Sequence, residues 1–287
     1  MSILKSDFAQ QLLAKLNVYY FTIAGQILPE VAAQQALRRF MTPPKTQRGP
    51  TETHFWDSAD RVPLPSGLDA RSFGSPQDPE VWVVHGWGSR SSVLRNIIEA
   101  LVIQNYYVIA WDAPAHGRNP QRTTNMLQVA TLLQKDLSIV GKPEVTLIGH
   151  SFGAGACAYV ASRHDQVTKL ITIGGVPDIR KVIFNFWKRI QLPLQAQKHF
   201  IDRVENTFGI TPLELSPIHF YPQVKAKWLL IHDKNDEDVD FKGIERFMSL
   251  KPSIQFLITE NLGHYKILKN TWVITKIIQF LRTGTIS

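Results

Sequence analysis

The amino-acid sequence predicts an α/β fold, with a mostly parallel central sheet and helices on both of its faces. Short, continuously apolar runs such as VWVV (81–84) and VTLI (145–148) alternate with longer stretches of helical periodicity. Strands that are apolar at every position are typical of parallel sheets, because helices cover both faces of such a sheet. A chain of 287 residues is long enough to bury one large core of this kind.

The predicted elements follow one another in a regular order. We expect strands at 81–84, 106–111, 145–148, 170–173, 228–231 and 254–258. Helices are expected at 93–104, 126–140, 153–163 and 271–281. Because open parallel sheets bind ligands at the carboxyl ends of their strands, the segments that follow the strands are where functional residues are expected.

Two segments depart from this alternation. Residues 1–45 are predicted to form an N-terminal helical extension, since apolar residues such as Leu16, Tyr19 and Ile23 recur at helical spacing. A stretch rich in proline and glycine, 41–50, links this extension to the main domain, 46–287. Within that domain, residues 176–224 are helical in pattern and carry no strand signal. A small helical cap inserted there would lie over the carboxyl ends of the strands.

Composition and charge narrow the classes of partner. The net charge is +8, but the basic residues are scattered and form no nucleic-acid-binding pattern, so no nucleic acid is expected. An anionic substrate or surface is compatible with the charge. Polar residues interrupt the apolar N-terminus, so we expect neither a signal peptide nor a transmembrane segment, and the cytoplasm is the default location. Peripheral membrane contact, or a partner protein, at the N-terminal helices stays open.

The segment GHSFG (149–153) has the pattern of a nucleophile elbow. It follows the apolar run 145–148 and precedes the small residues AGACA. In such an elbow a serine occupies a strained turn between a strand and a helix, and the glycines prevent collisions around it. Ser151 is therefore the candidate nucleophile. The single cysteine, Cys157, is expected to be a buried packing residue of the following helix.

A serine nucleophile needs a base and an orienting carboxylate. Among nine histidines, His264 lies after the last strand, where an elbow architecture has its base. The acid is expected at Asp236, which follows the strand 228–231 and can turn back toward His264. Asp233, which can instead cap the turn, and Asp178, one strand earlier, remain alternative acids.

Backbone N–H groups that bind the reaction's oxyanion are the last requirement. The residue after the nucleophile, Phe152, should supply one of them. The segment HGWG (85–88) follows the first clear strand, and its Trp87 should supply the other. Four residues are candidates for contact with the substrate: Trp87, His150, Phe186 and Trp187. The aromatic residues of the insertion can equally pack among its own helices.

Five segments together resemble the α/β-hydrolase fold superfamily. They are HGWG, WDAPAHGRNP (111–120), GHSFGAGA, IHDKNDEDV (231–239) and NLGHYKILKN (261–270). The resemblance covers residues 50–287 and is strongest to small bacterial serine esterase-like hydrolases of unassigned substrate. These relatives often carry glycine at the position of Asp233, which is a departure close to the proposed acid. The resemblance implies the triad Ser151, Asp236 and His264 without a metal or an organic cofactor.

The sequence therefore predicts a serine hydrolase that cleaves a small carboxylic ester or thioester through an acyl-enzyme. Three alternatives stay open. The same triad is compatible with C–C bond hydrolysis, lyase or amidase chemistry. A non-catalytic, ligand-binding member of the fold is the second alternative, and an adaptor that acts through its N-terminal helices is the third.

Overall fold

A computed structural model describes residues 2–250 and 253–286, with side chains from residue 15 onward. The chain divides into two compact units. The first unit consists of Met1–Thr42 and Asp178–Leu215, and the second of Pro43–Pro177 and Ser216–Ser287. The N-terminal helices thus share a unit with helices that were expected to form an insertion of the main domain.

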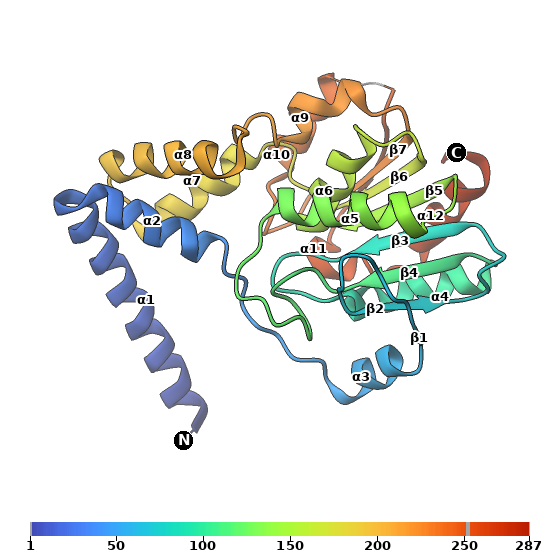
Figure 1. Cartoon of the computed structure of the whole chain (residues 1–287), viewed down its shortest axis with the longest axis horizontal. Coiled ribbons are helices and arrows are strands. Elements are labelled where there is room, and N and C mark those ends of the chain that lie inside the picture. Colours follow the sequence, from blue (N-terminus) through green and yellow to red (C-terminus); the bar gives the residue numbers. More distant parts are fainter. Residues whose placement is uncertain (1, 251–252, 287) are drawn as a thin grey trace. The chain divides into compact units, whose positions relative to one another are not determined.

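The second unit is built around a mixed sheet of eight strands among the described residues, in the order β1-β2-β4-β3-β5-β6-β7-β8 (Figure 1). The strands are β1 Asp60–Arg61, β2 Ala70–Phe73, β3 Glu80–Val84, β4 Tyr107–Trp111, β5 Val145–His150, β6 Val167–Ile173, β7 Lys227–Asp233 and β8 Gln255–Thr259. Strands β3 to β8 are parallel, whereas β1 and β2 pair antiparallel at one edge. The predicted α/β fold with a mostly parallel sheet is confirmed. All six expected strands are present, and β1 and β2 were missed because they are short and partly polar.

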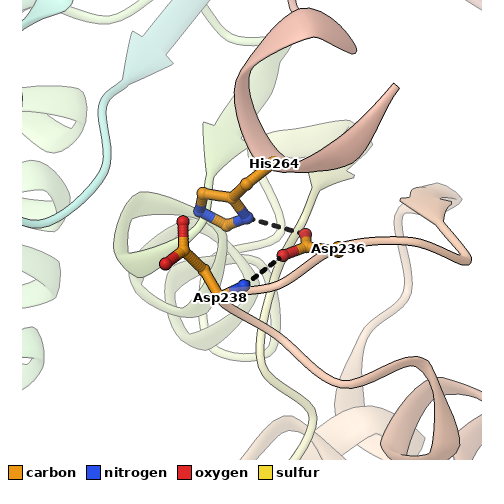
Figure 2. A group of neighbouring side chains, drawn as sticks. All are labelled: Asp236, Asp238 and His264. Atoms are coloured by element: carbon orange, nitrogen blue, oxygen red, sulfur yellow. Dashed lines mark hydrogen bonds and ion pairs between the residues drawn. The ribbon is translucent and has the colours of Figure 1, made fainter. Parts of the chain in front are cut away.

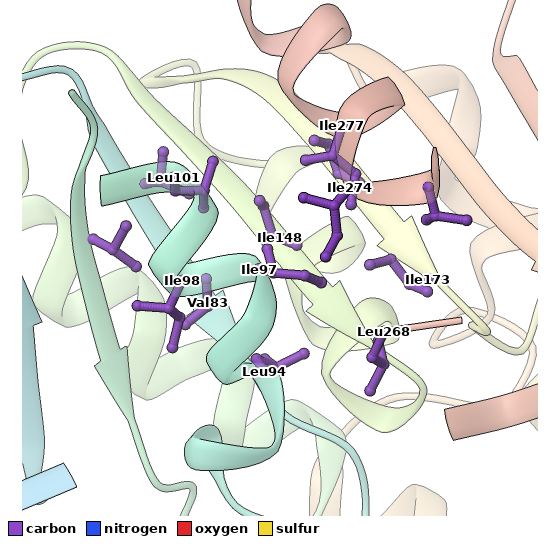
Figure 3. Packing of buried hydrophobic residues seen from close by; sticks show 14 of the residues in the cluster. Val83, Leu94, Ile97, Ile98, Leu101, Ile148, Ile173, Leu268, Ile274 and Ile277 are labelled. Carbon is purple, nitrogen blue, oxygen red and sulfur yellow. The ribbon is translucent and has the colours of Figure 1, made fainter. Parts of the chain in front are cut away.

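Helices cover both faces of this sheet. The elements of the second unit are α3 Pro50–Asp57, η1 Ser91–Leu94, α4 Arg95–Ile103, α5 Met126–Val140, α6 Phe152–Ala161, α9 Pro217–Phe220, η2 Tyr221–Gln223, α10 Phe241–Leu250, α11 Gly263–Lys266 and α12 Thr271–Thr283. On one face, Ile97 and Leu101 of α4 and Ile277 of α12 pack against Val83 and Ile148 of the sheet (Figure 3). Strand residues alternate between faces, so Trp82 and Leu147 point the other way, where α6 runs along β5 and β6.

The helix α6 explains the run of small residues that follows the elbow. Its residues from Gly153 to Ala158 are all buried, and Cys157 among them is fully buried. Burial raises the pKa of the Cys157 thiol well above its ordinary range, so the thiol remains protonated and unreactive. Small side chains let the helix approach the sheet closely and bring its first residue to the ends of the central strands.

In the described residues of the first unit there are four helices, α1 Ser2–Ile27, α2 Pro29–Phe40, α7 Ile179–Ile190 and α8 Leu194–Phe208. Its core contains small residues of α2, such as Ala33 and Ala36, and aromatic residues of α7 and α8, Phe186 and Phe200. These small residues allow α2 to lie along α8, the most extensive contact within the unit. Among the described residues, no helix is both long and apolar enough to cross a membrane.

Candidate active site

Ser151 lies in the turn that joins β5 to α6. Its backbone has φ +53° and ψ −114°, a left-handed conformation that side-chain-bearing residues rarely adopt. The Ser151 N–H donates to the carbonyl of Ile173 at the end of β6 (2.8 Å), which fixes the turn against the neighbouring strand. The hydroxyl is thereby carried past the strand end to the N-terminus of α6, where the helix dipole favours negative charge.

The glycines on either side of Ser151 are required by close approach. A Cβ added at Gly149 would lie 2.5 Å from the carbonyl oxygen of Gly153. A Cβ at Gly153 would overlap the carbonyl of Val84 and lie 2.6 Å from that of His85, both at the end of β3. The spacing of the GHSFG segment therefore has a steric origin, because any larger side chain at either glycine would separate α6 from the sheet.

Asp236, in the loop after β7, and His264, in the short helix α11 after β8, form a hydrogen-bonded pair. The Nδ1 of His264 lies 2.7 Å from Oδ2 of Asp236, and both side chains are buried (Figure 2). The other carboxylate oxygen accepts the backbone N–H groups of Asp238 (2.9 Å) and Val239 (2.8 Å). An ionised Asp236 requires a donor, so the geometry assigns the proton to Nδ1 and leaves Nε2 as the basic nitrogen.

The surroundings of Asp236 keep it ionised. Burial opposes the charge, but hydrogen bonds from the His264 ring and the Val239 N–H outweigh burial and hold the pKa of Asp236 below its ordinary value. The negative charge can therefore orient the imidazole throughout the neutral pH range. It can also stabilise an imidazolium that forms when His264 takes a proton.

Ser151 and His264 flank the same strand end. The Ser151 N–H is bonded to Ile173, and a Cβ added at the next residue, Gly174, would lie 3.1 Å from Cε1 of His264. In the part of the chain that the structure describes, the Ser151 hydroxyl makes no hydrogen bond to His264. Such bonds are often long or absent in an unliganded site and shorten when substrate binds.

The loop after β3 approaches the nucleophile from the opposite side. A Cβ added at Gly86 would lie 3.2 Å from Cβ of Ser151. The ring of the next residue, Trp87, packs edge-on against Phe152, with 5.0 Å between ring centroids. Phe152 is the first residue of α6, and the N–H groups of a first helical turn have no partner within the helix. The backbones of Trp87 and Phe152, the two predicted oxyanion donors, thus flank Ser151.

The two alternative acids have other partners. Asp233 accepts the hydroxyl of Thr259 (2.6 Å) and the backbone N–H groups of Leu262 (3.0 Å) and Asn235 (2.9 Å). Asp178 accepts the N–H of Arg180 at the start of α7 and forms an ion pair with its guanidinium. Asp236 is the one of the three carboxylates that is bonded to His264.

The remaining predicted site residues lie in three environments. Trp87 is half-buried beside Ser151. His150 is buried, its Nε2 lies 3.0 Å from the backbone carbonyl of His264, and burial lowers its pKa to about 3, so it is neutral and holds the backbone of the base. In the first unit, Phe186 is buried among aromatic rings and Trp187 packs edge-on against Phe200. The substrate contacts assigned to these residues stay predictions.

One carboxylate beside the pair was not expected there. Single ligand atoms of Asp236, Asp238 and His264 lie within 4.8 Å of one another (Figure 2). Among the described residues, this group has the spacing that a metal ion requires, but Nδ1 of His264 already donates to Asp236. A metal would therefore have to take Nε2, the nitrogen that a base needs. The side chain of Asp238 is exposed, and no sequence pattern assigned it a role in the site.

Residues 79–215 match the family model described as alpha/beta hydrolase fold. The strand order and the elbow geometry agree with that match. The chain is an α/β-hydrolase fold protein. The resemblance seen in the sequence motifs is thereby confirmed for the fold.

Curated relatives match this chain over part of their length. It is 28% identical over 152 residues to the pimeloyl-[acyl-carrier protein] methyl ester esterase of Vibrio campbellii, covering 52% of this chain and 55% of that protein. An uncharacterized protein of Mycobacterium tuberculosis is 29% identical over 111 residues, which span 37% of this chain and 32% of that protein. The chain thus spans about a third of the one relative and about half of the other.

Solved structures match it over a larger share of the chain. An esterase of Pyrococcus furiosus superposes with a TM-score of 0.64 at 18% identity, covering 84% of this chain and 96% of that one. A membrane phospholipase A, described as a bacterial virulence factor, superposes with a TM-score of 0.59 at 17% identity and covers 98% of both chains. At these identities the likeness shows the fold alone.

Proposed function

We propose that this α/β-hydrolase fold protein is a serine hydrolase that cleaves a small carboxylic ester or thioester. The observation that carries the proposal is the strained Ser151 turn beside the buried His264–Asp236 pair, whose Nδ1–Oδ2 distance is 2.7 Å. Non-glycine residues in this backbone conformation are strained, and such strain is concentrated at functional sites. The names of the relatives, two of them esterases, support an ester as substrate.

In the proposed reaction, Oγ of Ser151 attacks the substrate carbonyl carbon while Nε2 of His264 takes the hydroxyl proton. The tetrahedral oxyanion accepts hydrogen bonds from the N–H groups of Phe152 and Trp87. His264 then gives its proton to the leaving alcohol or thiol, and the acyl group remains on Ser151. In the second half of the reaction, water attacks the acyl carbonyl while Nε2 of His264 takes a proton from it, and His264 then returns that proton to Oγ of Ser151 as the acid is released.

Labelling with a fluorophosphonate tests this proposal. The wild type, Ser151→Ala and His264→Ala are compared beside a series of p-nitrophenyl esters of increasing acyl length. We expect labelling of the wild type alone, and a fall in turnover of at least about 10⁴-fold in either variant. Equal labelling of Ser151→Ala would identify another serine. A folded wild type that is neither labelled nor active would exclude the hydrolase and favour a ligand-binding role.

A second observation favours contact with a lipid surface. In the described part of α1 and α2, large apolar side chains are exposed, namely Leu16, Tyr19, Tyr20, Ile23, Ile27 and Val31. The same helices carry Lys15, Arg38 and Arg39. Exposed apolar side chains combined with cations are typical of helices that bind anionic membranes, and a fold neighbour is named a membrane phospholipase A. We propose peripheral binding of these helices to an anionic bilayer.

Flotation with vesicles of phosphatidylcholine and phosphatidylserine measures that binding. The wild type should float with vesicles that contain the anionic lipid, and the double variant Tyr19→Ser, Ile27→Ser should remain in the soluble fraction. A matched control is Ile103→Ser, Ile139→Ser, which removes two exposed apolar side chains of the second unit. Equal flotation of both double variants would exclude the N-terminal helices as the contact.

A further inference from the structure

The segment 86–92, which follows β3 and includes the start of η1, is called the oxyanion loop because Trp87 lies within it. It contacts a segment that precedes the whole sheet in the chain. Residues 44–48 belong to the same compact unit as the sheet and contact this loop at both of its ends. The predicted roles of Ser151, Asp236 and His264 do not involve that segment.

Arg48 anchors the far end of the oxyanion loop. Its side chain is 5% exposed, and its Nη2 lies 2.6 Å from Oδ2 of Asp112, a fully buried carboxylate. The other oxygen of Asp112 accepts the N–H of Ser91 (3.0 Å), while Nε of Arg48 donates to the Ser92 hydroxyl (3.2 Å). The Arg48 guanidinium also lies 4.3 Å from the centroid of the Trp56 ring. One buried ion pair thus holds two consecutive residues of the loop.

The near end of the loop is held at Gly88. Its N–H donates to Nε2 of His116 (2.9 Å), and its carbonyl accepts the Thr46 hydroxyl (2.8 Å). Gly88 has φ +64°, and a Cβ added to it would lie 2.5 Å from Cγ of Pro44. The residue before it is Trp87, so a displacement of Gly88 also moves the Trp87 backbone relative to Ser151.

We propose that Arg48 is a positioning residue for the oxyanion loop, acting through Asp112 and Ser91 to keep the Trp87 N–H directed at the carbonyl above Ser151. The inference rests on the proposed hydrolase function. Arginine suits this role because its planar guanidinium offers several donors in a rigid arrangement, so that it can bond Asp112 and Ser92 at once. Lysine would keep the charge but lose the planar fork and its stacking on Trp56.

The expected effect follows from how oxyanion donors act. A donor contributes mainly when charge develops on the carbonyl oxygen, so a displaced loop lowers kcat with little change in KM. Complete loss of one donor lowers kcat about 10²- to 10³-fold, and a partial displacement should lower it less. We expect about a 10-fold fall in kcat for Arg48→Lys and a smaller fall, of about 3-fold, for Thr46→Val, with Thr46→Ser restoring the rate.

The test measures three quantities on each folded variant: kcat and KM for a neutral p-nitrophenyl ester, the inhibition constant of a trifluoromethyl ketone, and amide hydrogen exchange across residues 85–94. The ketone forms a tetrahedral oxyanion on a serine, so its affinity should fall by the same factor as kcat/KM. Arg163→Lys is the matched control, because Arg163 is exposed and stacks on Tyr159, 3.7 Å from the ring centroid, on α6. It should leave all three quantities unchanged.

The outcomes separate this inference from the proposed function. Faster exchange at 85–94 in Arg48→Lys, with matched losses in kcat/KM and ketone affinity, supports positioning. Unchanged exchange, or a lower melting temperature with wild-type kcat and ketone affinity, overturns it and leaves Arg48 as a structural residue. If the wild type is neither labelled by fluorophosphonate nor active, the proposed function fails, and the exchange measurement alone still decides whether Arg48 holds the loop.

Discussion

On one side of Ser151, Asp236 lies in the loop after β7 and His264 lies in the short helix α11 after the neighbouring strand β8. On the other side, the loop after β3 is held by Arg48, Asp112 and His116, which come from two other parts of the chain. The acid–base side is therefore built from segments that directly follow strands of the parallel sheet, whereas the oxyanion side also depends on Arg48, a residue that precedes the whole sheet in the chain. Substitutions distant from the elbow should consequently affect the oxyanion side more.

The largest effect is expected from the carboxylate that contacts His264. Asp236→Asn keeps the size of the side chain but can donate to Nδ1, which favours the wrong tautomer of His264, so kcat should fall by about 10⁴-fold. Asp233→Asn is the matched control, because Asp233 is also buried but bonds Thr259 and Leu262. It should lower the free energy of unfolding by about 1–3 kcal/mol and change kcat less than about 10-fold.

Steady-state kinetics and urea unfolding on the same samples measure both quantities. The two substitutions should have different effects. Asp236→Asn should mainly lower kcat, whereas Asp233→Asn should mainly lower the free energy of unfolding. If Asp233→Asn lost more activity than Asp236→Asn, then Asp236 would not be the acid that orients His264, and the description of the acid–base side would be wrong.

Buried histidines on both sides of Ser151 make the stability of the fold depend on pH. On the oxyanion side the neutral His85 accepts the Ala113 N–H at Nε2 (2.9 Å). Burial, with a smaller contribution from His116, lowers the pKa of His85 to about 3 from 6.5, and burial and then His264 do the same for His150. Burial also lowers the pKa of His116. On the acid–base side, the pKa of Asp236 is held below 3.8.

The sign follows from proton uptake. Between pH 6.5 and about 3 the unfolded chain protonates His85 and His150 while the folded chain does not, so unfolding is favoured as pH falls. Each such histidine adds up to about 1.4 kcal/mol per pH unit. Asp236 contributes stability that is lost only at lower pH, as pH falls from 3.8 through its folded pKa. Urea unfolding at pH 7, 6 and 5 should show a declining free energy, and a flat profile would contradict neutral, buried histidines.

The sequence was informative where chemistry and sterics depend on near neighbours. The elbow glycines, the small residues of α6 and the placement of His264 after the last strand all follow from local pattern, and the mostly parallel sheet follows from the alternation of elements. Arg48 was not identified, because a lone arginine in a segment rich in proline has no periodicity that reveals a buried partner 64 residues away. The position of Asp238 near His264 was not predicted for a similar reason, because turn geometry decides which of several neighbouring acids lies near the imidazole.

The smallest effect concerns the nucleophile itself, where the two sides meet. Ser151 has φ +53°, whereas Ser162, at the end of the same helix, has the ordinary helical φ of −77°. At Ser162, replacement by glycine should be less stable than replacement by alanine by about 0.5–1 kcal/mol, because glycine gains more entropy on unfolding.

At Ser151 the order should reverse, with glycine more stable than alanine by about 1 kcal/mol, because glycine adopts this conformation without strain. Urea unfolding of the four variants measures the difference, which cancels the loss of the hydroxyl at each site. The same order at both positions would mean that the turn stores no strain. A reversed order would mean that the strained turn lowers the free energy of unfolding and that this strain holds the hydroxyl between its base and its oxyanion donors. Relief of the strain on either side would then displace the hydroxyl.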